Sequence, residues 1–288
     1  MWSLYHMAGI RVLCAAPFPV MVGPESRAFI TALDPALPLP PADLTLTLEP
    51  AEALDDRWKS GIRAADRYYL AAAEGLRVYY CLAGREPHAC ACWTGPDRIV
   101  CRYLRGREKD VNRSRNIVEF LSPETLLPAF GGLLLHAAFI RWQGRGILFT
   151  APSGTGKSTQ ARLWQEHLGA DVLNGDRAGL RDMDGSWTGW GLPCAGSSGI
   201  YRNESGPLGA IVTLSQGQEN EIRRLSASAA FVRLLPELNL RRWDGAAMGR
   251  GMDLLTDLLA RVPVYHLSCR PDREAVLLLR DTLMKENV

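Results

Sequence analysis

The chain has 288 residues, of which 47% are hydrophobic, so it is long and apolar enough for one large domain or two modest ones. A net charge of +2 at pH 7 is too small to indicate a nucleic acid or an anionic membrane as partner. The first 20 residues lack a basic leader and resemble no secretory signal, and no apolar run is long enough to span a bilayer. Seven cysteines in a chain of this size need no disulfide framework. We therefore expect a cytoplasmic protein with reduced thiols.

Residues 1–121 are expected to form a β-rich N-terminal region whose role the sequence does not indicate. Residues 44–48 alternate as a half-buried strand, and the four prolines within 34–41 exclude a helix there. An antiparallel meander is expected to follow, with strands at 68–72, 77–82, 88–93 and 99–104.

Several cysteines lie within this meander. If residues 84–87 and 95–97 are hairpin turns, Cys81, Cys90 and Cys101 fall opposite one another on one face of the sheet. A metal site is then conceivable. However, thiols are also ordinary small core residues, and the spacing matches no zinc module. We therefore favour the interpretation that these cysteines are core residues.

Residues 122–288 are expected to form a second domain of the α/β class. Ser122 and Pro123 are typical of a helix start. Apolar periodicity then predicts strands at 133–142, 147–150, 171–174, 208–214 and 262–267, helices at 157–167, 229–238, 244–260 and 272–283, and a loop-rich stretch at 182–206.

Residues 151–159 read A-P-S-G-T-G-K-S-T and lie between an expected strand and an expected helix. In this order a glycine-containing loop lets main-chain N–H groups converge on phosphate oxygens. Lys157 would place a cation on the terminal phosphates, and the Ser158 hydroxyl is the expected Mg²⁺ ligand at the helix start. Ala151 departs from the usual glycine. We expect ATP and Mg²⁺ as cofactors, held by Ser153, Gly154, Thr155, Gly156, Lys157, Ser158 and Thr159.

Two further residues are candidates for chemistry beside this loop. Asp176 follows the short strand at 171–174, and α/β sheets place their ligands at the carboxyl ends of strands, so Asp176 could order Mg²⁺ or accept a proton. His136 lies in the strand before the loop. A lone histidine among leucines and alanines is more often a hydrogen-bonded core residue than a catalyst, and both interpretations stay open.

Four segments together resemble the catalytic domain of HPr kinase/phosphorylase: L-H-A at 135–137, G-I-L-F at 146–149, the phosphate loop at 152–159 and L-N-G-D at 173–176. In that family a strand carrying His-Gly precedes a Walker A loop, and a strand ending in Asp-Asp follows it. Phosphoenolpyruvate carboxykinase shares the nucleotide core and a similar loop. The resemblance is greatest to HPr-kinase-related serine kinases of bacterial peptide-modification systems and covers roughly residues 125–288. It implies a P-loop core of the HPr kinase and carboxykinase type, α+β overall with the N-terminal region.

The resemblance gives each matching residue a role. Lys157 and Ser158 would hold nucleotide and Mg²⁺, Asp176 matches the second acidic residue of the Asp-Asp pair, and His136 matches the family histidine. Gly175 stands where the first Asp is expected and Ala137 replaces the glycine after the histidine. Whether Asp176 serves the metal, the proton, both or neither alone is therefore open.

A later loop supplies weaker candidates. Glu204 could complete the metal shell, and Arg202 could neutralise charge on the transferring phosphoryl group, although an internal ion pair between them is equally compatible with the sequence. Trp187, Trp190 and Pro193 could clamp an acceptor peptide, but aromatic side chains that cap the edge of a core are more common.

The leading hypothesis is a kinase that transfers the γ-phosphoryl group of ATP to a Ser or Thr hydroxyl of a protein or peptide, with Asp176, His136 and Lys157 as catalytic residues and Ser158, Asp176 and Glu204 as metal ligands. The alternatives are a small-molecule or carboxykinase-like phosphoryl transferase and a nucleotide-binding regulatory protein without turnover. The resemblance also suggests assembly into a homo-oligomer. No nucleic acid or membrane partner is expected.

Overall fold

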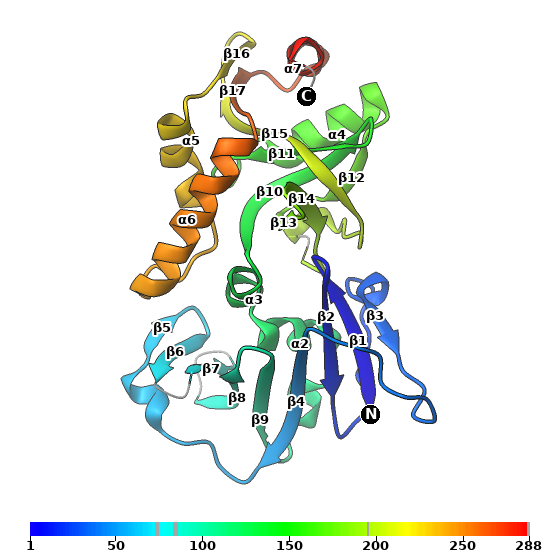
Figure 1. The fold of residues 1–288 in the computed structure, drawn as a ribbon, viewed down its shortest axis with the longest axis vertical. Helices are drawn as coiled ribbons and strands as arrows, with labels where there is room; N and C mark the ends of the chain where they lie inside the picture. The colour runs from blue at the N-terminus through cyan, green and yellow to red at the C-terminus, as the bar shows by residue number, and fades with distance from the viewer. Residues whose placement is uncertain (73–74, 83–85, 195, 287–288) are drawn as a thin grey trace. The chain divides into compact units, whose positions relative to one another are not determined.

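The computed structural model describes residues 1–72, 75–82, 86–194 and 196–286 (Figure 1). Its contacts divide the chain into two compact units, Met1–Leu126 and Leu127–Val288, and the division falls within helix α3 (Pro123–Ala129). Within the described ranges, no helix combines the length and the apolar character that crossing a bilayer requires. Both units contain a large sheet, and the expected α/β class with a β-rich N-terminal region is confirmed.

The first unit is built on a nine-stranded sheet in the order β3-β1-β2-β4-β9-β8-β7-β6-β5. The central strands β2, β4 and β9 pair in parallel, and the outer ones pair antiparallel. The expected strand at 44–48 and the meander are confirmed. Helices α1 (Glu108–Val111) and α2 (Ser114–Leu121) were not predicted. The strands are β1 (Trp2–Met7), β2 (Ile10–Ala15), β3 (Ile30–Ala32), β4 (Leu44–Ala51), β5 (Ile62–Ala64), β6 (Arg67–Ala72), β7 (Gly75–Cys81), β8 (Pro87–Gly95) and β9 (Arg98–Leu104).

The expected alignment of three cysteines on one face of this sheet is wrong. Cys90 lies opposite Arg102 on β9, whereas Cys101 lies opposite Ala91, so Cys90 and Cys101 point to opposite faces. Cys90 instead shares its face with Cys92, and their sulfur atoms are 3.5 Å apart. Across the described residues no three His, Cys, Asp or Glu side chains converge as a metal site would require. Part of the expected 84–87 turn lies outside the described residues.

The second unit contains an eight-stranded sheet in which two long strands exchange partners along their length. The first half of β10 pairs with β13 and its second half pairs with β11, while β15 pairs first with β14 and then with β11. Outside 182–206 the expected strands and helices are present, although the helix expected at 229–238 is shorter than predicted. The elements are β10 (Gly132–Trp142), β11 (Arg145–Thr150), α4 (Lys157–Leu168), β12 (Asp171–Asn174), β13 (Arg177–Met183), β14 (Ser186–Gly191), β15 (Ser205–Gln216), β16 (Glu221–Arg224), α5 (Ala227–Leu234), α6 (Gly245–Arg261), β17 (Val264–Cys269) and α7 (Arg273–Lys285).

Two expectations for this unit need correction. The stretch 182–206 is not mainly loop, because it contains the end of β13, all of β14 and the start of β15. Asp184 and Gly185 both have positive φ (53° and 87°) and form the two-residue turn between β13 and β14. The helix expected at 229–238 ends at Leu234, because Pro236 cannot continue it, and residues 235–237 form a 3-10 turn.

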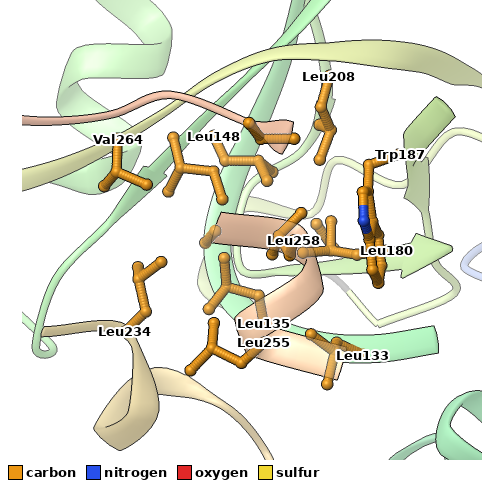
Figure 2. Close-up of a cluster of buried hydrophobic side chains, with 14 of the residues drawn as sticks. Leu133, Leu135, Leu148, Leu180, Trp187, Leu208, Leu234, Leu255, Leu258 and Val264 are labelled. Atoms are coloured by element: carbon orange, nitrogen blue, oxygen red, sulfur yellow. The ribbon is translucent and has the colours of Figure 1, made fainter. Parts of the chain in front are cut away.

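Helices cover both faces of this sheet, each over its own core. Along β10, Leu133, Leu135 and Phe139 point to the face covered by α5 and α6, where Figure 2 shows Leu234, Leu255 and Leu258 against the strands. The alternate residues Ala138 and Ile140 point to the face covered by α4 and α7. This alternation with a period of two buries the strand on both sides and fixes its register.

Candidate functional site

The phosphate loop has the backbone that its sequence predicts. Gly154 and Gly156 have φ values of 82° and 119°, which favour glycine, and a Cβ built on either would meet nothing within 4 Å. The side-chain positions of both glycines are therefore unobstructed, and both residues line the cavity described below. The Thr155 side chain donates to the Pro152 carbonyl at 2.9 Å and closes the turn. Helix α4 begins directly afterwards at Lys157, so its N-terminus faces the same space.

Lys157 and Ser158 lie at the start of α4. The Lys157 side chain is buried, and its Nζ donates to the Ala151 carbonyl at 2.8 Å, folded back across the loop. Burial lowers the pKa of the Lys157 ammonium, while the carboxylates of Glu237 and Asp176 oppose that shift. Ser158 Oγ donates to the Gly175 carbonyl at 3.2 Å, which joins the helix start to the segment after β12.

Asn174, the last residue of β12, holds the segment that carries Asp176. It is fully buried, and its Oδ1 accepts from the backbone N–H groups of Asp176 at 2.9 Å and Arg177 at 3.0 Å. Its Nδ2 donates to the carbonyls of Leu192 at 2.8 Å and Cys194 at 3.0 Å. All four hydrogen-bonding positions of the amide are used in this way. The position of Asp176 therefore depends on a buried amide rather than on a flexible loop.

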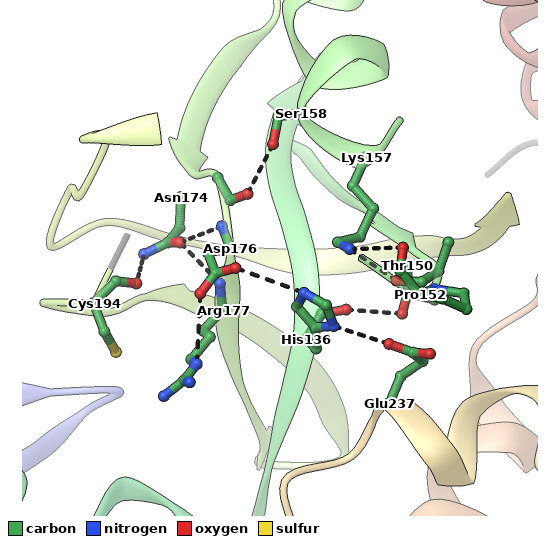
Figure 3. A network of polar contacts seen from close by, with 12 residues as sticks. His136, Thr150, Pro152, Lys157, Ser158, Asn174, Asp176, Arg177, Cys194 and Glu237 are labelled. Atoms are coloured by element: carbon green, nitrogen blue, oxygen red, sulfur yellow. Dashed lines mark hydrogen bonds and ion pairs between the residues drawn. The ribbon is translucent and has the colours of Figure 1, made fainter. Parts of the chain in front are cut away.

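Figure 3 shows His136 between two carboxylates. His136 Nδ1 lies 2.9 Å from Glu237 Oε2, and its Nε2 lies 3.6 Å from Asp176 Oδ1. Asp176 also lies 3.5 Å from the Arg177 guanidinium. The Ala137 N–H donates to the Asp176 carbonyl at 2.9 Å, which fixes the aspartate beside β10. His136, Asp176 and Lys157, expected to act together, are thus neighbours at one edge of the sheet.

Gly175, in the place of an expected acidic residue, lies under a 3-10 turn at 196–198. A Cβ built on Gly175 would lie 2.2 Å from Ser198 Oγ and 2.3 Å from its Cβ. Gly196 in the same turn has a φ of 53°, and a Cβ there would lie 2.7 Å from Asp176 Cγ. The turn packs directly over both residues. With this turn in place, no side chain fits at position 175.

A cavity of about 550 Å³ adjoins the phosphate loop. It extends from Gly154 and Thr155 past Gln160 of α4 to Gln216 at the end of β15 and Arg270 after β17. Since it opens from the loop amides on the side of the parallel strands β15 and β17, it has the location and the volume for the rest of a nucleotide.

The structure places Glu204 and Arg202 elsewhere. Glu204 Oε2 lies 2.7 Å from Arg141, which also bonds to Asp171 at 3.0 Å, and Arg202 lies 3.4 Å from Asp171. Asp171 begins β12, whereas Ser158 contacts Gly175 beyond the end of that strand. Glu204 is therefore in an ion-pair network at the other end of β12; its nearest partner is Arg141, which was not anticipated, and the anticipated partner Arg202 lies 3.9 Å from it.

The three candidates for a peptide clamp are distributed along β14 and its exit. Trp187 is 3% exposed, belongs to the core under α6, and donates from its ring N–H to Asp257 at 2.9 Å. Trp190 lies on the same strand and Pro193 follows it. For Trp187 the packing is that of a core residue.

Glu237 was not predicted from the sequence to be a site residue, and the structural role of Asn174 was not predicted either. Glu237 is 101 residues from His136 in sequence and stood in an expected helix as an ordinary acidic residue. The chain reaches the site there because Leu238 bridges to Leu135 and the Asn239 N–H donates to the Leu134 carbonyl at 2.9 Å. The only local signal was Pro236, which interrupts the helical pattern.

Comparison with known proteins gives one family and distant likenesses to solved structures. No curated protein matches the chain. Among solved structures, the HPr(Ser) kinase/phosphatase from Coxiella burnetii matches at 12% identity and a TM-score of 0.33, covering 54% of this chain and 99% of that one. The family described as SynChlorMet cassette protein ScmC matches residues 100–271, which is more than half of the chain. The chain belongs to the ScmC family.

Proposed function

We propose that this chain is an ATP-dependent kinase that transfers the γ-phosphoryl group to a Ser or Thr hydroxyl of a protein or peptide. One observation carries the proposal: an open phosphate loop, Lys157, Ser158 and Asp176 converge at one edge of the sheet, beside a cavity of about 550 Å³. The sequence resemblance to HPr-kinase-related serine kinases supports the choice of acceptor.

The residues at this edge fit a magnesium ion. Mg²⁺ prefers oxygen ligands, keeps several waters, and in kinases is bound through one or two carboxylates together with substrate phosphates. The Ser158 hydroxyl and the Asp176 carboxylate would hold it. The two residues are connected in the fold because Ser158 Oγ donates to the carbonyl of Gly175, the residue before Asp176, at 3.2 Å. When bound, the ion supplies charge neutralisation to the phosphate oxygens.

The chain's own groups would act mainly by position and charge. The loop amides and the N-terminus of α4 bind the phosphate chain, and Lys157 leaves the carbonyls of Ala151 and Pro152 for a phosphate oxygen. Moving a buried ammonium from neutral carbonyls to an anion strengthens its hydrogen bonds. His136 and Asp176 face the place where an acceptor hydroxyl would lose its proton.

A binding experiment with a matched control tests the nucleotide part. ATP with Mg²⁺ is titrated calorimetrically into wild type, Lys157→Met, and Lys285→Met, which changes an exposed lysine at the end of α7. Losing a charge-assisted contact should weaken binding about 10-fold to 100-fold in Lys157→Met only. Equal affinity in all three proteins would refute a phosphate-binding Lys157.

Transfer is tested with γ-labelled ATP and a peptide library in which each member carries one Ser or Thr. Label should appear in peptides with wild type and disappear with Lys157→Met. One observation favours a second candidate, a nucleotide-binding protein without turnover: Gly175 lacks the acidic side chain, and Ser198 fills its space. That candidate predicts normal ATP binding with no labelled peptide, whereas transfer to the library excludes it.

A further inference from the structure

We propose that Glu237 is a positioning residue that fixes the tautomer of His136, so that His136 Nε2 accepts the proton of the acceptor hydroxyl. The inference rests on the proposed kinase function and deepens it. In this assignment the proton of the acceptor hydroxyl goes to His136, which Glu237 holds from a segment 101 residues away in sequence. Asp176 then serves as a magnesium ligand and not as the base.

The two contacts of the imidazole are not equivalent. The Nδ1 to Glu237 Oε2 distance of 2.9 Å is that of a hydrogen bond, whereas the Nε2 to Asp176 Oδ1 distance of 3.6 Å is too long for one. A carboxylate oxygen accepts, so in the tautomer that makes this hydrogen bond Nδ1 carries the hydrogen. Nε2 then carries a free lone pair directed toward the Asp176 side, as a general base requires.

Glu237 is built to hold this position. Its side chain is only 12% exposed, so little water competes for the carboxylate. The backbone on both sides is fixed: the Pro236 carbonyl accepts from Arg242 at 2.9 Å, and the Asn239 N–H donates to Leu134 at 2.9 Å. A partly buried carboxylate on Nδ1 of a histidine base can orient the base and stabilise the imidazolium.

The acceptor O–H bond breaks and its proton goes to His136 Nε2, while the oxygen forms a bond to the γ-phosphorus. The bond from that phosphorus to the bridging oxygen breaks, and ADP leaves with the electron pair. The imidazolium then lies between Glu237 and Asp176, whose negative charges stabilise it until the proton passes to solvent.

The tautomer is measured directly by nitrogen-15 NMR of the imidazole side chains in the full chain without nucleotide, at a pH where histidine is neutral. The chain has five histidines, and His136→Asn assigns the signal. Wild type should show hydrogen on Nδ1. In Glu237→Gln and Glu237→Ala that preference should be lost. Hydrogen on Nε2 in wild type, or the same tautomer in all three proteins, would overturn the proposal.

The kinetic readout separates positioning from folding and from nucleotide binding. ATP hydrolysis with Mg²⁺ serves as the assay, with water as the acceptor. Glu237→Gln should lower kcat by about 10²-fold or more and leave the KM for ATP within about twofold, because the phosphate contacts are untouched. The control Glu221→Gln, an exposed residue on β16, should change neither. A raised KM with normal kcat would overturn the assignment.

The two readouts also distinguish this inference from the proposed function. If wild type binds no ATP, the kinase proposal fails, but the NMR measurement still decides the tautomer. If wild type binds and hydrolyses ATP while Glu237→Gln keeps full kcat, the kinase proposal stands and the role of Glu237 falls.

Discussion

Asn174 offers the sharpest test of how the site is held in place. The substitution Asn174→Ala removes four hydrogen bonds at 2.8 to 3.0 Å from a residue with no exposed surface. At about 1 kcal/mol of net stability for each bond, the expected loss is about 4 kcal/mol. A typical domain is stable by only about 5 to 15 kcal/mol, so this loss is a large part of the total.

The assay is urea unfolding followed by tryptophan fluorescence, since the core of the second unit contains Trp164 and Trp187. Asn220→Ala is the matched control. It removes one bond to Asp272 and one from the Arg270 N–H, both at the partly exposed end of the sheet, so it should cost about 1 to 2 kcal/mol. A loss below about 1 kcal/mol for Asn174→Ala, or one no larger than that of the control, would refute the buried-amide account.

Two further predictions concern titrating groups. Burial lowers the pKa of His266, so the unfolded chain binds protons more strongly than the folded one, and the free energy of unfolding should fall as pH drops below about 6.5. Urea midpoints measured between about pH 7.5 and 5.5 report this dependence, and His266→Gln should flatten it. The same slope in the variant and in wild type would contradict the role of His266. The hydrogen bond from Cys90 and the charge of Arg77 lower the pKa of Cys92, whereas burial raises that of Cys269. Because Cys92 is buried, alkylation would not report its thiolate, but ultraviolet titration of the thiolates should detect Cys92 at a lower pH than Cys269, and Arg77→Ala should move the Cys92 step to higher pH; an unmoved step would argue against the thiolate.

Local patterns in the sequence predicted most of the second unit, because its signals act over a few residues. The strand, loop and helix around 147–167 follow from apolar alternation, glycine positions and helical spacing. The failure at 182–206 was also local. Asp184-Gly185 is a standard two-residue hairpin signal, but the glycine-rich sequence around it resembled loop.

The candidate site was predictable only in part, for a physical reason. Lys157, Ser158 and Asp176 belong to one strand-loop-helix-strand run, so their proximity follows from chain order. Glu237 comes to His136 because a 3-10 turn after α5 bridges back to β10. That contact depends on tertiary packing, and a single sequence contains no periodicity that reports it.

The contact between Gly175 and Ser198 has a consequence for how relatives of this chain can diverge. A carboxylate at 175 and the present turn at 196–198 compete for the same volume, so one substitution alone would force the turn outward. Acquiring that acidic side chain is therefore coupled to a shift of the turn at 196–198. Lineages with one aspartate and lineages with two should accordingly differ in the length or conformation of this distant turn as well.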